Sequence, residues 1–177
     1  QVWASADHAG KKPFGLMTCR GERIDRRAPG TNMNIRWAAD MTTQIISGTF
    51  DEPAAIDDWR RGRLLTAHGT RTNNGTKGNP CLVADLFGDW REELVVRTAD
   101  SSAIRIYMST ELTDRKLYTL MHDPQYRVGI ANQNVVYNQP AYPSFYLASD
   151  IDWAKVPVPD IHAPRASNPS DREVTAG

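Results

Sequence analysis

Short apolar segments separated by turn-forming residues run through the first 150 residues of this chain. Most are four to six residues long, and Gly, Pro, Asn or Asp lies near most of their ends, a pattern typical of β-strands in an all-β fold. The predicted strands cover residues 2–5, 15–19, 34–37, 44–47, 64–67, 81–84, 93–98, 104–108, 117–121 and 144–148. One segment differs: Asp123 as N-cap and Pro124 at the first helical position predict a short helix over residues 124–134.

Three of these segments resemble one another. They read Gln-Val-Trp-Ala-Ser at residues 1–5, Gln-Ile-Ile-Ser-Gly at 44–48 and Glu-Leu-Val-Val-Arg at 93–97, so they start 43 and then 49 residues apart. A period near 45 residues with about four strands per unit is typical of propeller blades. Since propellers need about 4–8 blades, the two and a half blades predicted here indicate part of a larger ring.

The end of the chain has a different composition. After Trp153 it contains four prolines, Pro157, Pro159, Pro164 and Pro169, and few large apolar residues. We therefore expect residues 1–153 to be a partial β-propeller, in which 144–148 is a lone closing strand, and residues 154–177 to be a Pro-rich tail or linker. The first residue is Gln1 rather than Met, which indicates a processed or cut N-terminus.

Charge narrows the set of partners. The 177 residues carry 21 basic and 21 acidic side chains, so the formal net charge is zero. A nucleic-acid clamp or a polybasic membrane surface needs an excess of positive charge, and no apolar stretch approaches the roughly 20 residues that span a bilayer. We expect neither nucleic acid nor membrane as a partner. Cys19 and Cys81 fit either one disulfide or two buried thiols.

The segment richest in candidate chemistry is the acid loop, residues 85–93 (Asp-Leu-Phe-Gly-Asp-Trp-Arg-Glu-Glu). Acidic residues stand at positions 1, 5 and 9 between two predicted strands, and the glycine at position 4 permits a sharp turn. Calcium prefers six to eight oxygens from carboxylates and backbone carbonyls. In the predicted site Asp85, Asp89 and Glu93 supply side-chain oxygens, and Phe87 and Arg91 supply carbonyls. The alternative is a surface turn with solvated acids.

Two further segments are candidates for binding. The lysine loop, residues 72–80, is polar and Gly-rich and contains Lys77. Such loops present backbone N–H groups and a placed side chain, although the composition alone favours an ordinary turn over a site. The amide segment, residues 130–140, combines five Asn and Gln side chains with Tyr137. Amides and aromatic faces suit sugar recognition, but amides also cap helices and turns.

These segments together resemble a known family. Asn-Asn-Gly-Thr-Lys at 73–77, the acid loop, Arg-Thr-Ala-Asp-Ser-Ser-Ala at 97–103, Leu-Tyr-Thr-Leu-Met-His-Asp-Pro at 117–124 and Tyr-Asn-Gln-Pro at 137–140 are similar to the C-terminal part of rhamnogalacturonan lyases of polysaccharide lyase family 11. The resemblance is dense over about residues 72–149. Where the family has an acidic Trp-Asp-Gly-Asp pattern, residues 37–40 read Trp-Ala-Ala-Asp.

The resemblance implies the C-terminal blades of a calcium-binding eight-bladed β-propeller, completed by an N-terminal remainder of the same propeller. It implies a secreted, extracellular lyase that cleaves the rhamnose–galacturonate bond of pectin rhamnogalacturonan I by β-elimination. The site residues it implies are Lys77 as catalytic lysine, Asn74, Gly75 and Thr76 in one sugar-contact loop, and Asn134, Val136 and Tyr137 in a second.

The implied chemistry suits these residue types. A base can remove the C5 proton of a uronate only if calcium or arginine neutralises the carboxylate and stabilises the enolate-like transition state. Lys77 is either that base, if its surroundings lower its pKa, or a charge clamp on the uronate. The alternative function is a non-catalytic, calcium-stabilised propeller module that binds carbohydrate or protein. A zero net charge is compatible with an acidic polysaccharide, since bound calcium supplies local positive charge.

Overall fold

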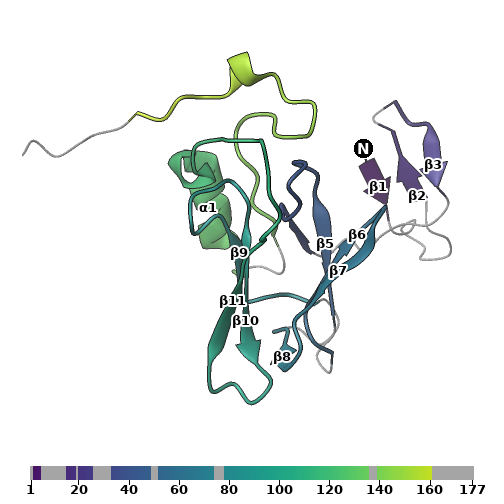
Figure 1. Cartoon of the computed structure of the whole chain (residues 1–177), viewed down its shortest axis with the longest axis vertical. Coiled ribbons are helices and arrows are strands. Elements are labelled where there is room, and N and C mark those ends of the chain that lie inside the picture. Colours follow the sequence, from purple (N-terminus) through teal and green to yellow (C-terminus); the bar gives the residue numbers. More distant parts are fainter. Residues whose placement is uncertain are drawn as a thin grey trace, which may run out of the picture.

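The computed structural model describes residues 2–4, 15–18, 20–25, 33–48, 52–73, 78–135 and 139–160. Within these ranges the chain is mostly β-structure with one short α-helix (Figure 1), which confirms the prediction at this level. The strands form three antiparallel sheets. The first contains β1 (Val2–Ala4), β2 (Gly15–Met17) and β3 (Arg23–Asp25), joined in chain order.

The second sheet is a four-stranded meander. It contains β4 (Met33–Ile35), β5 (Gln44–Ser47), β6 (Ala55–Asp58) and β7 (Gly62–Thr66) in chain order. The sequence did not predict β6, because acidic residues are depleted in strands. In the structure Asp57 accepts hydrogen bonds from Ser47 and Arg63, and Asp58 accepts one from Gln44. These partners compensate the two carboxylates inside the sheet.

The third sheet has one interrupted edge strand. Its members are β8 (Thr70–Arg71), β9 (Leu82–Ala84), β10 (Glu93–Thr98) and β11 (Ile104–Tyr107). Both β8 and β9 pair with β10: Arg71 lies opposite Arg97, and Leu82 lies opposite Val95. The edge strand is therefore interrupted between Arg71 and Leu82, and the lysine loop connects β8 to β9 at this interruption.

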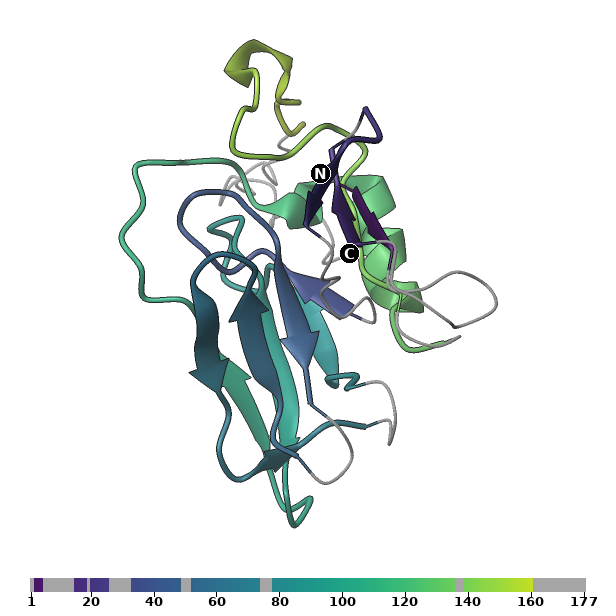
Figure 2. The ribbon, with the colours of Figure 1, turned by 90° about the vertical axis from the view of Figure 1, so that its right-hand side faces the viewer.

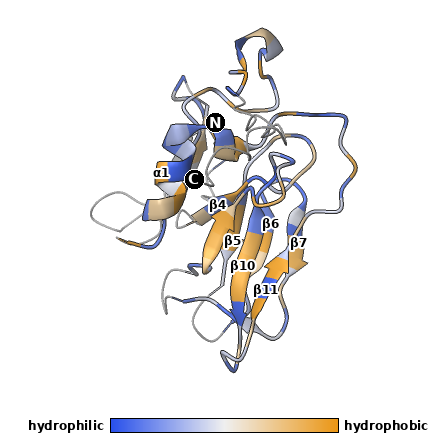
Figure 3. Ribbon diagram, turned by 90° about the vertical axis from the view of Figure 1, so that its left-hand side faces the viewer, coloured by the Kyte–Doolittle hydropathy of each residue, from blue (hydrophilic) through white to orange (hydrophobic). Residues whose placement is uncertain are grey.

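The second and third sheets pack against each other around the larger hydrophobic core (Figure 2). That core combines Met33, Ile35, Ile46 and Ile56 of the second sheet with Val83, Leu94 and Val96 of the third, all buried. Hydropathy colouring shows apolar residues along most of β5 and β10 (Figure 3). The short apolar runs read from the sequence thus predict these two strands correctly.

The predicted helix is present as α1 (Pro124–Asn132), with the Asp123 side chain accepting from the Tyr126 N–H at its N-terminus and Pro124 in its first turn. A short 3₁₀ helix, η1 (Leu120–His122), precedes α1, and a second one, η2 (Trp153–Lys155), lies further along the chain. A smaller core joins α1 to the acid loop through Trp90, Leu120 and Tyr126. Over the described ranges, no helix has the length and apolar character needed to cross a bilayer.

Two predicted strands are wrong. Residues 117–119 lead into η1, and residues 144–148 form no strand. Their backbone N–H groups bind side chains instead of a neighbouring strand: Leu120 donates to Asp85 Oδ2 at 2.7 Å, and Ser144 donates to Asp123 Oδ2 at 3.2 Å. These carboxylates take two backbone donors that the predicted strands 117–121 and 144–148 would use.

Candidate functional site

The base of the lysine loop is fixed within the third sheet. The Asn73 N–H donates to the Asn79 carbonyl at 2.7 Å, which closes the loop, and the Cys81 N–H donates to the Val95 carbonyl at 2.8 Å. Thr72 and Asn79 are buried. Lys77 and its neighbours Asn74, Gly75 and Thr76 lie outside the described residues. The structure therefore describes the two ends of the lysine loop, residues 72–73 and 78–80.

A close glycine contact anchors the same loop to the second sheet. Gly78 has a φ of +60°, and a Cβ atom there would lie 2.4 Å from the carbonyl oxygen of Gly48, which follows β5. A side chain at position 78 would therefore be strained twice, by its backbone conformation and by the backbone of residue 48. The residue directly after Lys77 is held between two sheets, and only glycine fits there without movement.

Cys81 ends the lysine loop as a free thiol. Its sulfur contacts the side-chain amide of Asn73, with the amide nitrogen at 3.4 Å. The other cysteine, Cys19, lies outside the described residues. Because Cys81 is a free thiol, the disulfide alternative is not what the structure contains at Cys81.

The second predicted contact loop is closed at the end of α1. Gln139 donates its N–H to the Gln133 carbonyl at 3.2 Å, so residues 134–138 leave and return at the same place. Asn134 is exposed, whereas Val136 and Tyr137 lie outside the described residues. The Asn134 side-chain amide donates to the Cys81 carbonyl at 2.6 Å. The structure therefore brings Asn134, from the second predicted contact loop, to Cys81, the residue that follows the lysine loop, although the two are 53 positions apart in sequence.

The amides of this segment also serve the backbone, as the capping alternative expected. Gln133 is 1% exposed, and its side chain binds both polar groups of one residue in β9: it accepts from the Val83 N–H at 2.7 Å and donates to the Val83 carbonyl at 2.8 Å. The sequence did not identify Gln133, because its partner lies fifty positions away. The only signal in the sequence was an amide residue immediately before the candidate contact residue Asn134.

The acid loop is held by hydrogen bonds between its own side chains and backbone. Gly88 has a φ of +79°, as the predicted sharp turn requires. Asp85 Oδ1 accepts from the Gly88 N–H at 2.8 Å, and Glu93 Oε2 accepts from the Leu86 N–H at 2.7 Å and from the Phe87 N–H at 3.3 Å. Two of the predicted calcium-binding carboxylates thus hold the backbone of their own loop.

Burial makes these two carboxylates weak acids. It raises the pKa of Asp85, and it raises the pKa of Glu93 to about 7, with the charges of Asp85 and Asp89 adding to the effect on Glu93. Backbone hydrogen bonds from Leu86 and Phe87 partly offset the rise at Glu93. The alternative of a turn with solvated acids is therefore not what the structure contains: Asp85 and Glu93 are both buried.

The carboxylates of the acid loop are nevertheless not arranged around a common metal position. Among the described residues, no group of three or more His, Cys, Asp or Glu side chains is arranged to hold an ion. Asp89 is paired with the Arg91 guanidinium, and the side chain of Phe87 is 59% exposed. For calcium to bind in this geometry, Asp89 would have to leave Arg91, and Glu93 would have to turn away from the backbone of Leu86 and Phe87.

The acid loop and the lysine loop lie at opposite ends of β9. Cys81 precedes the strand and Asp85 follows it, and four residues of extended chain span about 13 Å. The acid loop and the described C-terminal end of the lysine loop are therefore about 13 Å apart along the strand.

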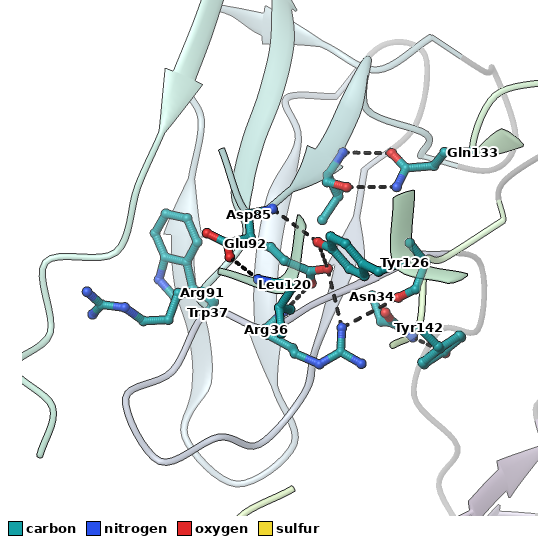
Figure 4. A network of polar contacts seen from close by, with 12 residues as sticks. Asn34, Arg36, Trp37, Asp85, Arg91, Glu92, Leu120, Tyr126, Gln133 and Tyr142 are labelled. Carbon is teal, nitrogen blue, oxygen red and sulfur yellow. Dashed lines mark hydrogen bonds and ion pairs between the residues drawn. The ribbon is translucent and has the colours of Figure 1, made fainter. Parts of the chain in front are cut away.

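A buried polar network connects the acid loop to α1 (Figure 4). Glu92 is 2% exposed and forms an ion pair with the equally buried Arg36, at 3.3 Å. Tyr126 donates its hydroxyl to Glu92 Oε1 at 2.7 Å and accepts from the Asp85 N–H at 3.0 Å. Burial, and secondly the charge of Glu92, raise the pKa of Tyr126, so its hydroxyl stays protonated. Tyr126 thus fixes the N-terminal half of α1 at one end of β9.

Residues 1–157 match the family described as Rhamnogalacturonan lyase family 11, C-terminal domain. The rhamnogalacturonan exolyase YesX of Bacillus subtilis (strain 168) is 46% identical over 166 residues, 88% of this chain. The rhamnogalacturonan endolyase YesW of the same strain is 44% identical over 170 residues, 93% of this chain. The chain spans about a quarter of these relatives, 27% of YesX and 25% of YesW.

Solved structures agree with these matches. The crystal structure of the exotype rhamnogalacturonan lyase YesX superposes with a TM-score of 0.73 at 43% identity, over 85% of this chain and 27% of that one. A rhamnogalacturonan lyase PL11 of Bacillus licheniformis gives a TM-score of 0.71 at 39% identity, over 85% of this chain and 27% of its own. The described strands and α1 therefore have the arrangement of one part of a larger enzyme.

Proposed function

Since this chain belongs to rhamnogalacturonan lyase family 11 as its C-terminal domain, we propose that the complete protein cleaves the rhamnose–galacturonate bond of rhamnogalacturonan I by β-elimination. The observation that carries the proposal is the hydrogen bond from Asn134 to the Cys81 carbonyl. It places Asn134, which the family resemblance assigns to the sugar, beside the residue that follows the lysine loop. A polymer with alternating rhamnose and galacturonate needs more than one such contact to be held in a single register.

Lys77 has a defined task in this proposal. It takes the C5 proton of the galacturonate, or it pairs with the uronate carboxylate so that another base can do so; either way the bond from C4 to the leaving oxygen breaks and a C4–C5 double bond forms. A neutral lysine requires burial or nearby cations. Asn74, Gly75, Thr76, Asn134, Val136 and Tyr137 are proposed to hold the sugar on either side of that bond. No step is derived through calcium.

The proposed architecture is an eight-bladed β-propeller whose C-terminal blades lie in residues 1–153. The four-stranded meander of β4 to β7 supports it, because that is the arrangement of a propeller blade, and so does the packing of two successive sheets face to face. The partner that completes the ring is the N-terminal remainder of the same propeller, and residues 154–177 are a tail or linker. The substrate is a cell-wall polymer, so we propose that the protein is secreted and acts outside the cell.

Calcium at the acid loop stays a prediction of the sequence and the resemblance. If Asp85, Phe87, Asp89, Arg91 and Glu93 bind it, calcium at a hundred times its Kd should stabilise the protein by about 2.7 kcal/mol and raise its Tm. Glu93→Gln, which keeps an acceptor for the backbone of Leu86 and Phe87, should reduce that rise, whereas Asp114→Asn at an exposed position should not.

Calorimetry of the complete protein with calcium and with chelator measures this shift. An equal rise in Tm for the parent and Glu93→Gln would show that the acid loop binds no calcium and that its own hydrogen bonds suffice. Because the readout is stability, the result does not depend on whether the enzyme is active.

The proposed function is tested by incubating the complete protein with rhamnogalacturonan I and following ultraviolet absorbance. Each eliminated bond leaves a C4–C5 double bond conjugated with the carboxylate, which absorbs where the intact polymer does not. We expect absorbance to increase steadily and to require the rhamnose–galacturonate backbone, with none from plain polygalacturonate. Binding to the polymer without any absorbance would instead favour the alternative, a non-catalytic propeller module that binds carbohydrate.

A further inference from the structure

One buried amide links the two contact loops in a way that the family resemblance does not assign. The C-terminal end of α1 lies along the edge of β9 that is not paired with β10, and Gln133 occupies that edge. Val83 presents its N–H and its carbonyl on the same side, and the Gln133 side chain satisfies both. The amide therefore takes the place that a residue of a further strand would have.

Gln133 acts on the amide segment through its backbone as well. Its N–H donates to the Ile130 carbonyl and its own carbonyl accepts from the Gln139 N–H, so it holds both ends of residues 134–138. The next residue, Asn134, then reaches the Cys81 carbonyl at 2.6 Å. Hydrogen bonds thus connect the C-terminal end of α1, through Gln133 and Asn134, to Cys81, the residue that follows the lysine loop.

We propose that Gln133 is a positioning residue for substrate binding: it fixes Asn134 and the closed amide segment against β9, at a set distance from the end of the lysine loop. This inference rests on the proposed function. It follows from the two hydrogen-bonded points between α1 and β9 with its following residue, since Tyr126 holds the helix near Asp85 and Gln133 holds its C-terminal end near Val83. Without the second point, the C-terminal end of α1 loses its hydrogen bonds to β9, and Asn134 leaves Cys81.

The test compares Gln133 with a second buried glutamine. Gln44 is equally buried, and its amide accepts from the Trp37 and Ala38 N–H groups and donates to Thr42 and Asp58. It lies at the end of β5 away from Gly48, so it is remote from the lysine loop. Gln44→Leu should therefore lower stability with no effect on substrate binding, and it is a matched control for Gln133→Leu.

In the complete protein, we expect Gln133→Leu and the isosteric Gln133→Glu to raise KM for rhamnogalacturonan I about tenfold, as the loss of one or two sugar contacts predicts, with kcat changed less than threefold. The carboxylate of Gln133→Glu lacks the donor for the Val83 carbonyl, so it should share the defect while keeping the shape. Gln44→Leu should keep the parent KM.

An unchanged KM in both Gln133 variants, or an equal rise in Gln44→Leu, would overturn the inference. Hydrogen exchange tests the inference without enzymatic turnover. Gln133→Leu should speed exchange of the Val83 and Gln139 N–H groups and leave exchange of the β5 N–H groups unchanged. Unchanged exchange at Val83 and Gln139 would also refute the inference. If the parent protein yields no unsaturated product, the proposed function fails, and exchange alone decides whether Gln133 holds the segment.

Discussion

Replacing Lys77 with alanine in the complete protein should lower kcat on rhamnogalacturonan I by about 100- to 10,000-fold, the usual contribution of a general acid–base group. We expect the Tm to change little, because both proposed roles of Lys77 are toward the substrate. Initial rates of unsaturated product, measured at saturating substrate, report this loss directly. Product release at the parent rate would exclude both roles of Lys77.

Two further variants sharpen this result. Lys155→Ala removes an exposed lysine whose ion pair with Asp152 lies in the C-terminal segment, and it should keep full activity. Lys77→Arg keeps the positive charge, but a guanidinium does not lose its proton near neutral pH and so cannot act as the base. Partial recovery of kcat in Lys77→Arg indicates a charge clamp on the uronate, whereas a loss as deep as that of alanine indicates the base.

Gly78→Ala should have the second-largest effect, although it adds only a methyl group. The new Cβ would overlap the Gly48 carbonyl and hold an ordinary residue in a left-handed conformation, for a combined cost of about 2 to 4 kcal/mol. The backbone must shift to relieve the overlap, and Lys77 is the residue next to it. We expect a lower Tm together with a fall in kcat of about 100-fold, because small misplacements of a reacting group cost that much.

Gly62→Ala separates the steric part from the conformational part. Gly62 also has a positive φ, +78°, but no atom lies within 4 Å of its added Cβ, and it starts β7 at the end of the second sheet away from Gly48. This variant should lose some stability and keep its kcat. Equal kcat values in Gly78→Ala and the parent would refute the role of the Gly48 contact in placing Lys77.

Local patterns predicted the parts of the fold that depend on neighbours in sequence. The apolar runs of β5 and β10 and the Asp123–Pro124 helix start were sufficient for those elements. The same reasoning failed where distant partners decide. β6 carries two acidic residues that Arg63 and Gln44 bind, and residues 117–121 are apolar enough to predict a strand but give the Leu120 N–H to Asp85.

The candidate site divides in the same way. Its loops were visible as polar, Gly-rich or amide-rich stretches, and the resemblance supplied their roles. The contact that joins them could not be predicted, because Asn134 and Cys81 are 53 positions apart and nothing local indicates the pairing. Likewise, Glu92 stands beside Glu93 in the sequence, yet one pairs with Arg36 and the other with its own loop. Adjacent acids do not reveal which partner each will find.

The mass of the reaction products tests the central claim most directly. The complete protein is incubated with rhamnogalacturonan I to completion, and the oligosaccharides are analysed by mass spectrometry. β-Elimination forms a double bond without consuming water, so each newly cut fragment ending in galacturonate should be lighter by one water molecule than its hydrolytic counterpart. Fragments with the full hydrolytic mass would contradict the assignment of this protein as a lyase.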